Sequence, residues 1–191
     1  MFSSINAAGS LIINTLFDLY IFVLLIRIIL VAIRVDYYNP ISQFVVKLTQ
    51  PIVNPVRKFI PNYKNIEIST VILVLVFEFI KFLLLGILFV GMPNVIGIFL
   101  IAFADALQFS LNIFFYAILI QAVMSWIQPG NTPITQILTR MTDPLMRPAQ
   151  RIIPLVGGID ITPIPVMLGL RLIIILVALP LLNIGQTIAF T

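Results

Sequence analysis

Residues 68–90 read ISTVILVLVFEFIKFLLLGILFV, an apolar run whose charged members are Glu78 and Lys81. A bilayer core about 30 Å thick is crossed by roughly 20 helical residues, so this stretch predicts a membrane-spanning helix. Three further runs meet the same requirement, at residues 11–35, 99–127 and 165–184. The run at 99–127 exceeds one upright span, and residues 95–104 at its start are expected to lie along the interface or to tilt the helix.

The composition supports a membrane protein and excludes several kinds of catalytic and metal site. The chain has 191 residues, of which 61% are hydrophobic and 9% charged. A soluble domain carries about 25% charged residues. The chain has no Cys and no His, which excludes thiolate metal sites, thiol nucleophiles and histidine general bases. We therefore predict an all-α membrane protein with four transmembrane helices, no catalytic, metal or cofactor residues, and a first span retained as an anchor.

The basic residues predict the orientation. Eight of the 11 Lys and Arg lie in the two long connections, and none lies in the N-terminal segment, the turn at 91–97 or the C-terminal tail. Cytoplasmic loops carry the excess of Lys and Arg, so both connections are expected in the cytoplasm and both termini outside it. The bacterial inner membrane is the expected location. The basic loops are expected to contact anionic lipid headgroups, and no nucleic-acid partner is expected.

The two connections repeat each other. Residues 49–61 read TQPIVNPVRKFIP and residues 142–154 read TDPLMRPAQRIIP. A shift of 93 superposes the three prolines of each segment, and the same shift places Pro40 on Pro133 and Glu67 on Asp160. The chain is thus expected to contain two repeats of equal orientation, at residues 1–93 and 94–191. Each repeat is a helix, a cytoplasmic loop and a helix.

Each loop is predicted to contain an amphipathic interfacial helix. Asn39 and Thr132 resemble N-caps, each followed by proline in the first turn. Apolar residues then recur at helical spacing, so Phe44 and Ile137 are expected to face lipid. The neighbouring polar residues are expected to face water. Pro51 and Pro144 are expected to end these helices. The loops either only anchor the protein or form a docking surface for a protein partner.

The loop motif resembles the YggT family of bacterial membrane proteins, which has plastid relatives of the YlmG type. The resemblance rests on residues 36–44, DYYNPISQF, and on the motif of residues 49–61, and it extends over both halves. The second copy departs from the motif, with Asp143 in place of Gln50 and one basic residue in place of two. The motif residues are Pro51, Pro55, Arg57, Lys58, Pro61, Pro144, Pro148, Arg151 and Pro154.

The resemblance implies roles in ion homeostasis and tolerance of osmotic stress, or in division and cytochrome assembly. It implies no catalytic residue. Three hypotheses follow: a scaffold or assembly factor acting through the loops, an ion-homeostasis protein moving potassium or protons, and, least favoured, a membrane enzyme. A membrane-protein partner or a homo-oligomer is compatible with the first two. The spans show no sustained face of small residues from which to predict oligomers.

Charges inside the spans form a candidate intramembrane network. Its expected members are Asp18, Arg27, Glu78, Lys81 and Arg171. Ionisable groups at membrane depth cost about 2.5 to 3.5 kcal/mol each, so they require partners or water. Counting residues from the cytoplasmic ends predicts pairs of Arg27 with Glu78 and of Asp18 with Lys81. Arg171, at the position equivalent to Glu78, is expected to reach Glu78 too. Such pairs either hold the bundle together or line an ion path.

Overall fold

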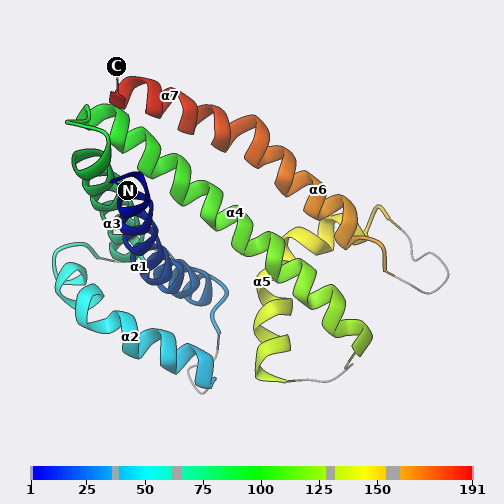
Figure 1. Ribbon diagram of the computed structural model, residues 1–191. Coiled ribbons are helices and arrows are strands. Elements are labelled where there is room, and N and C mark those ends of the chain that lie inside the picture. The colour runs from blue at the N-terminus through cyan, green and yellow to red at the C-terminus, as the bar shows by residue number, and fades with distance from the viewer. Residues whose placement is uncertain (1, 36–38, 62–65, 128–131, 154–159, 191) are drawn as a thin grey trace.

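The computed structural model describes residues 2–35, 39–61, 66–127, 132–153 and 160–190, and every element in these ranges is a helix (Figure 1). In chain order the elements are α1 (Phe2–Ala32), α2 (Pro40–Arg57), α3 (Ile68–Phe89), α4 (Val95–Ile127), α5 (Pro133–Gln150), α6 (Pro163–Ile173), η1 (Ile174–Ala178) and α7 (Leu179–Phe190).

Four helices are long and apolar enough to cross a membrane, which confirms the predicted spans. They cover Ser4–Ala32, Ile68–Phe89, Val95–Ser125 and Pro163–Phe190. The third span is one continuous helix from Val95, so residues 95–104 form its first turns. The spans pack in the order α1, α3, α4 and α6–α7, with α2 and α5 together at the end away from the C-terminus (Figure 1).

The fourth span contains one wide turn. Pro180 has no N–H, so the helix cannot continue through it with a regular hydrogen-bond ladder. The π-helical segment η1 precedes it, and the Leu179 N–H reaches back five residues to the Ile174 carbonyl. Such bulges accommodate a disrupted ladder within a helix that otherwise stays α-helical.

The tandem repeat is visible in the helix boundaries. Helices α1 and α4 begin at Phe2 and Val95, and α2 and α5 begin at Pro40 and Pro133, a shift of 93 in each case. The predicted division after residue 93 falls in the turn between α3 and α4, and it remains a prediction as a domain boundary.

Both surface helices begin at the predicted caps. The Asn39 side chain accepts from the Ile41 N–H, and Thr132 forms a reciprocal capping box with Thr135. The prediction that Pro51 and Pro144 end the helices was wrong, because α2 continues to Arg57 and α5 to Gln150. These prolines lie on exposed faces, where the carbonyls that lose their N–H donors can bind water.

Small residues bring α4 and α7 into close contact, which the sequence reasoning missed. A Cβ added at Gly97 would overlap the backbone nitrogen of Ala189, and one added at Gly185 would crowd Ile101. The Asn94 N–H donates to the Ala189 carbonyl at 2.8 Å. Close backbone approach through small residues is a common way for helices to associate in lipid.

Candidate functional site

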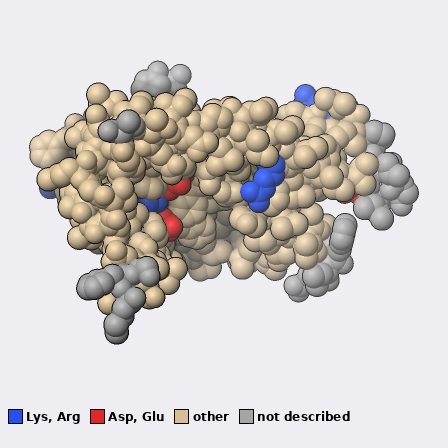
Figure 2. All heavy atoms as spheres, turned by 45° about the horizontal axis from the view of Figure 1, so that its top comes forward, with Lys and Arg blue, Asp and Glu red and all other residues tan. Residues whose placement is uncertain are grey.

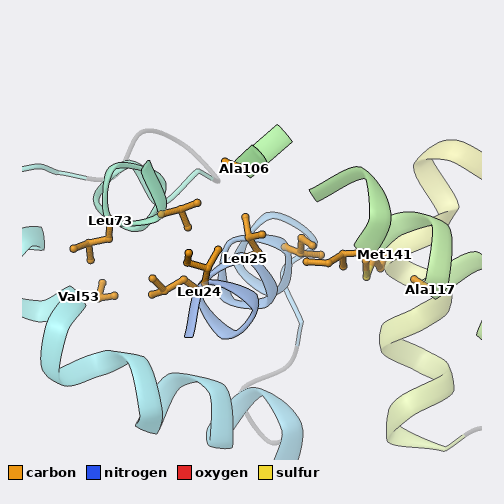
Figure 3. Packing of buried hydrophobic residues seen from close by; sticks show 11 residues of the cluster. Leu24, Leu25, Val53, Leu73, Ala106, Ala117 and Met141 are labelled. Atoms are coloured by element: carbon orange, nitrogen blue, oxygen red, sulfur yellow. The ribbon is translucent and has the colours of Figure 1, made fainter. Parts of the chain in front are cut away.

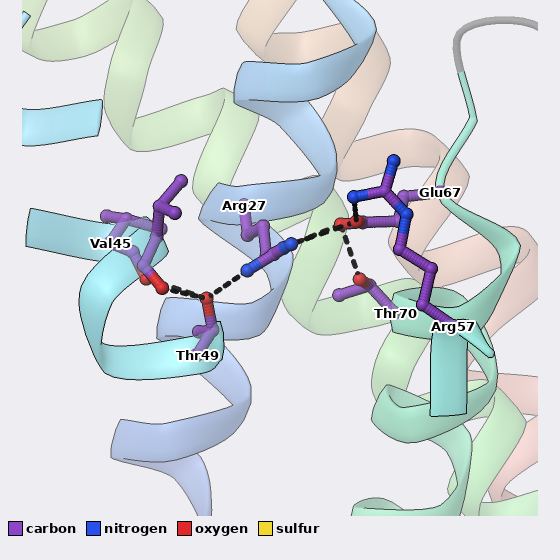
Figure 4. Close-up of polar contacts among 7 residues, drawn as sticks. Arg27, Val45, Thr49, Arg57, Glu67 and Thr70 are labelled. Atoms are coloured by element: carbon purple, nitrogen blue, oxygen red, sulfur yellow. Dashed lines mark hydrogen bonds and ion pairs between the residues drawn. The ribbon is translucent and has the colours of Figure 1, made fainter. Parts of the chain in front are cut away.

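A buried arginine links three helices of the first half at the loop end. Arg27 of α1 donates from Nε and one terminal nitrogen to the two carboxylate oxygens of Glu67, at 2.6 and 2.9 Å. Its other terminal nitrogen donates to Thr49 Oγ1 of α2 at 2.7 Å. Thr70 of α3 donates to Glu67 as well, at 2.6 Å (Figure 4). We call Arg27, Thr49, Glu67 and Thr70 the arginine clamp.

The clamp is satisfied and shielded. All four residues are at most 5% exposed, and the Thr49 hydroxyl donates to the Val45 carbonyl one turn earlier. Burial alone would raise the pKa of Glu67, but hydrogen bonds from Arg27 and Thr70, with the charges of Arg27 and Arg57, outweigh it and lower that pKa below its usual value. Glu67 therefore stays ionised, and a bidentate pair of this kind fixes geometry as well as charge.

The second half replaces the clamp with neutral contacts. Thr142, the equivalent of Thr49, donates to Gln121 of α4 and to the Leu138 carbonyl. Asp160, the equivalent of Glu67, accepts from Gln150 and from the Thr162 N–H, each at 2.9 Å. Burial alone would raise the pKa of Asp160, but these hydrogen bonds lower it.

A second charged cluster lies near the middle of the spans. The Lys81 Nζ of α3 lies 2.5 Å from Glu78 Oε2, 2.7 Å from Asp105 Oδ2 of α4 and 2.9 Å from Asp18 Oδ1 of α1. We call these four residues the lysine cluster. Three carboxylates surround one ammonium, so acidic groups are in excess.

The lysine cluster is partly exposed. Glu78 is fully buried, whereas the Asp105 and Asp18 side chains are 23% and 45% exposed. On the face drawn in Figure 2, charged atoms are rare, and acidic and basic atoms meet in a hollow. Neither carboxylate oxygen of Glu78 has a hydrogen-bond partner among the described residues, so its contact is the ion pair with Lys81.

An apolar layer separates the two charged groups. Asp18 and Arg27 are nine residues apart in α1, about 14 Å along the axis. The buried residues between the clusters belong to one hydrophobic core: Ile21, Leu24 and Leu25 of α1, and Leu73 and Val74 of α3. Figure 3 shows several of them, with Val53 of α2 alongside. A continuous polar path is therefore not formed between the clusters in this conformation.

The predicted network is partly correct. The pair of Asp18 with Lys81 is confirmed. The pair of Arg27 with Glu78 was wrong, because Glu67 at the start of α3 lies closer to the depth of Arg27. Arg171 does not reach Glu78 either, because it lies in α6 beside α4. There it donates to Asn112 Oδ1 at 3.3 Å and stacks over the Phe115 ring.

Two members of the charged groups escaped the sequence reasoning. Asp105 is an acidic residue inside the third apolar run, and this position alone was reason to include it in the predicted charge network. Glu67 is not among the expected members of the network, although the 93-residue shift places it on Asp160, another acidic residue. The roles of all these charges remain predictions.

The described residues of the loop motif lie at the surface. Pro51 and Pro55 are inside α2, Pro144 and Pro148 are inside α5, and all four are exposed. Four further members are exposed at or after the helix ends: Arg57, Lys58, Pro61 and Arg151. Pro154 lies outside the described residues.

The two predicted lipid-facing positions behave differently. Phe44 of α2 is 61% exposed, whereas Ile137 of α5 is buried against Leu30 and Val45, so the prediction for Ile137 was wrong. The reason is that α5 packs on α1 of the first half. Among the described residues, no group of three or more acidic residues could hold a metal ion.

The sequence matches the CCB3/YggT family profile in two segments, residues 7–88 and 100–182. It is 38% identical over 164 residues to an uncharacterized protein in the proC 3' region of Vibrio alginolyticus, covering 85% of this chain and 89% of that protein. An uncharacterized protein of Pseudomonas aeruginosa is 35% identical over 176 residues, covering 91% and 89%. The uncharacterized protein YggT of Escherichia coli K12 is 36% identical over 162 residues, covering 84% of each chain. No solved structure matches.

Proposed function

The chain belongs to the CCB3/YggT family, and on that premise we propose that this multi-pass membrane protein is a non-enzymatic scaffold or assembly factor acting through α2 and α5. The observation that carries the proposal is the arginine clamp. Its bidentate ion pair joins the loop ends of two spans, and a further buried hydrogen bond from Arg27 to Thr49 holds the surface helix α2 to them. A helix that only floated at the interface would not need such fixation.

The exposed charges of α2 and α5 support a docking role. These helices and their caps carry exposed Lys47, Arg57, Lys58, Arg140, Arg147 and Arg151. Among these, Arg147 pairs with Asp143 one turn away, and Arg57 lies 3.9 Å from Glu67 of the clamp. The basic side chains suit anionic headgroups, each attracted by about 1 kcal/mol near the surface, and acidic segments of a partner protein. We propose that this face lies in the cytoplasm of a bacterium, with both termini across the inner membrane.

Site-specific photocrosslinking in cells tests this role. A photoreactive amino acid at Lys58 should give an adduct of one discrete mass, and the same amino acid at Met92, exposed at the opposite end of the spans, should not. Charge reversal at Lys47, exposed on the same helix and outside the arginine clamp, should weaken the Lys58 adduct while the protein level stays unchanged. Identical adducts at both positions, or no adduct at Lys58, would contradict a docking face.

The lysine cluster favours a second candidate, a role in ion homeostasis or osmotic tolerance. Three carboxylates against one ammonium leave an excess of two negative charges if all are ionised, and a proton or a monovalent cation would relieve it. Movement of that ion to the loop side would require the apolar layer around Leu24 and Leu73 to open.

Purified protein in liposomes separates the two candidates. The scaffold proposal predicts potassium and proton fluxes equal to those of empty liposomes. The ion proposal predicts a flux above that level, which Asp105→Asn reduces and which Lys58→Ala, at the exposed surface, leaves unchanged. A flux insensitive to Asp105→Asn would exclude the lysine cluster as the route.

A further inference from the structure

We propose that copies of this chain associate head to tail in the membrane, the second repeat of one copy receiving α1 and α2 of the next. The contact between the repeats inside one chain provides the template. There α4 packs against α3, and α5 packs against α1 and α2. In the described residues, α7 does not pack extensively against α1, and α4 does not pack extensively against α2. The internal interface is therefore heterologous, because the two repeats contribute different faces to it. Each repeat keeps uncovered the face that the other repeat uses in this interface.

The template at the end of the spans near the termini is apolar. Phe79, Phe82 and Leu83 of α3 pack against a core containing Ile98 of α4. The 93-residue shift converts the three α3 residues into Leu172, Ile175 and Leu176, and it converts Ile98 into Ile5 of the next copy. All four equivalents are large apolar side chains and all are exposed.

The template at the loop end gives the same result. Leu30 of α1 and Val45 of α2 form a buried cluster with Ile137 of α5. Their equivalents are Val123, Leu138 and, on the next copy, Phe44. Val123 is 42% exposed and Phe44 61% exposed, and Leu138 is half-buried. The face of the first repeat that buries Ile137 thus has an uncovered equivalent on the second repeat, and Phe44, the equivalent of Ile137, is uncovered on the first.

The ion pair between the two repeats is replaced by apolar residues at the equivalent positions of the proposed interface between copies. Lys81 and Asp105 form an ion pair across the repeats. The shift places Ile174 at the position of Lys81 and Ile12 of the next copy at the position of Asp105. An interface between copies would therefore bury no unpaired charge there, which is the condition that lipid-embedded association imposes. A second copy fits this face because the chain itself carries both complementary halves.

Engineered cysteines test the arrangement, because the chain has no cysteine of its own. Two single variants, Phe44→Cys and Val123→Cys, are co-expressed with different tags, and membranes are oxidised mildly. We expect a disulfide-linked dimer carrying both tags, several-fold above that from Phe44→Cys with Ile164→Cys, an exposed control at the same membrane face. The double variant Leu30→Cys/Ile137→Cys should form the internal template disulfide in the same membranes.

Three outcomes would overturn the proposal. The first is efficient formation of the internal Leu30–Ile137 disulfide without a mixed-tag dimer above the control, which would mean that lipid covers the face. The second is a dimer formed equally well by Phe44→Cys alone, which would mean an isologous contact. The third is a monomeric mass for the unmodified protein in native bilayer particles. In contrast, a closed ring or a longer chain of copies in these particles would support head-to-tail association.

Discussion

The two halves place equivalent helices in register, yet they hold them together by different interactions. The first half joins its spans through ions, with the arginine clamp at the loop end and the lysine cluster near the middle of the spans. The second half uses Thr142 with Gln121, Arg171 with Asn112, and close contact at Gly97. Duplication thus preserved the helix positions while the means of fixing them diverged. The ionic half is expected to be sensitive to charge, and the neutral half to volume.

The largest expected effect comes from removing the arginine of the clamp. Arg27→Met leaves the buried Glu67 with the exposed Arg57, 3.9 Å away, as its only basic partner among the described residues, which should cost about 3 to 5 kcal/mol of unfolding free energy. The matched change in the second half, Gln121→Leu, removes a neutral hydrogen bond and should cost about 1 kcal/mol. Denaturant unfolding in detergent measures both.

A double-mutant cycle gives the control for this prediction. Arg27→Met combined with Glu67→Gln should lose less stability than the two single changes together, because neither variant partner then carries a buried charge. Simple addition of the two losses would mean that the clamp is not energetically coupled, and the contrast between the halves would disappear.

The lysine cluster should show the next largest effect. Lys81→Met removes the ammonium shared by three carboxylates and should cost about 3 kcal/mol, the low end for a stranded charge because Asp18 and Asp105 are partly exposed. Adding Asp105→Asn should restore part of the loss. Arg171→Met, which breaks a 3.3 Å hydrogen bond and a ring contact, should cost about 1 kcal/mol. Equal losses for Lys81 and Arg171 would contradict the assignment.

The spans were predictable because a run such as residues 68–90 has no alternative to a membrane helix. The repeat was predictable because prolines and caps, such as Asn39 and Thr132, stand at fixed spacing. The pairing of Arg27 was not, because depth counting treats helices as parallel rods and ignores the residues that precede a helix. Glu67 stands just before α3, so its carboxylate reaches a neighbour that the count assigned to Glu78.

The burial of Ile137 shows a second limit of sequence reasoning. Equivalent positions in a repeat have the same periodicity, so the pattern assigns Phe44 and Ile137 the same surroundings. The difference arises because Leu30 of α1 and Val45 of α2 cover Ile137, whereas Phe44 stays 61% exposed. Periodicity identifies an apolar face but not what packs against it.

A smaller effect should distinguish the halves by volume. Gly97→Ala places a Cβ against the backbone of Ala189, which cannot move without shifting α7, and should cost about 1 to 3 kcal/mol. Gly9→Ala, near the start of α1, meets only the tip of the Phe89 ring, so the higher helix propensity of alanine should keep its change within about 1 kcal/mol. Thermal unfolding in detergent should rank the two variants, and the reverse order would refute the close contact of α4 with α7.

The smallest expected effect is a dependence on pH. The pKa of Glu67 is lowered from its usual 4.5. A carboxylate whose pKa is lower in the folded state contributes stability above its unfolded pKa, and this contribution is lost as the pH falls through the folded value. The stability of the unmodified protein should therefore decline below about pH 4.5. Glu67→Gln should be less stable at neutral pH but should decline less in acid.

Asp160 supplies the comparison in the second half. Its pKa is lowered from a usual 3.8 by hydrogen bonds from neutral groups, and its side chain is partly exposed. Asp160→Asn should therefore flatten the acid decline less than Glu67→Gln does, and only at lower pH. Melting temperatures of the unmodified protein and the two variants are measured across the acid range. Subtracting each variant's curve from that of the unmodified protein cancels the contribution of the other carboxylates. If the Glu67→Gln curve ran parallel to that of the unmodified protein, Arg27 would not be stabilising an ionised Glu67. The bidentate pair would then contribute no charge-dependent stability to the clamp.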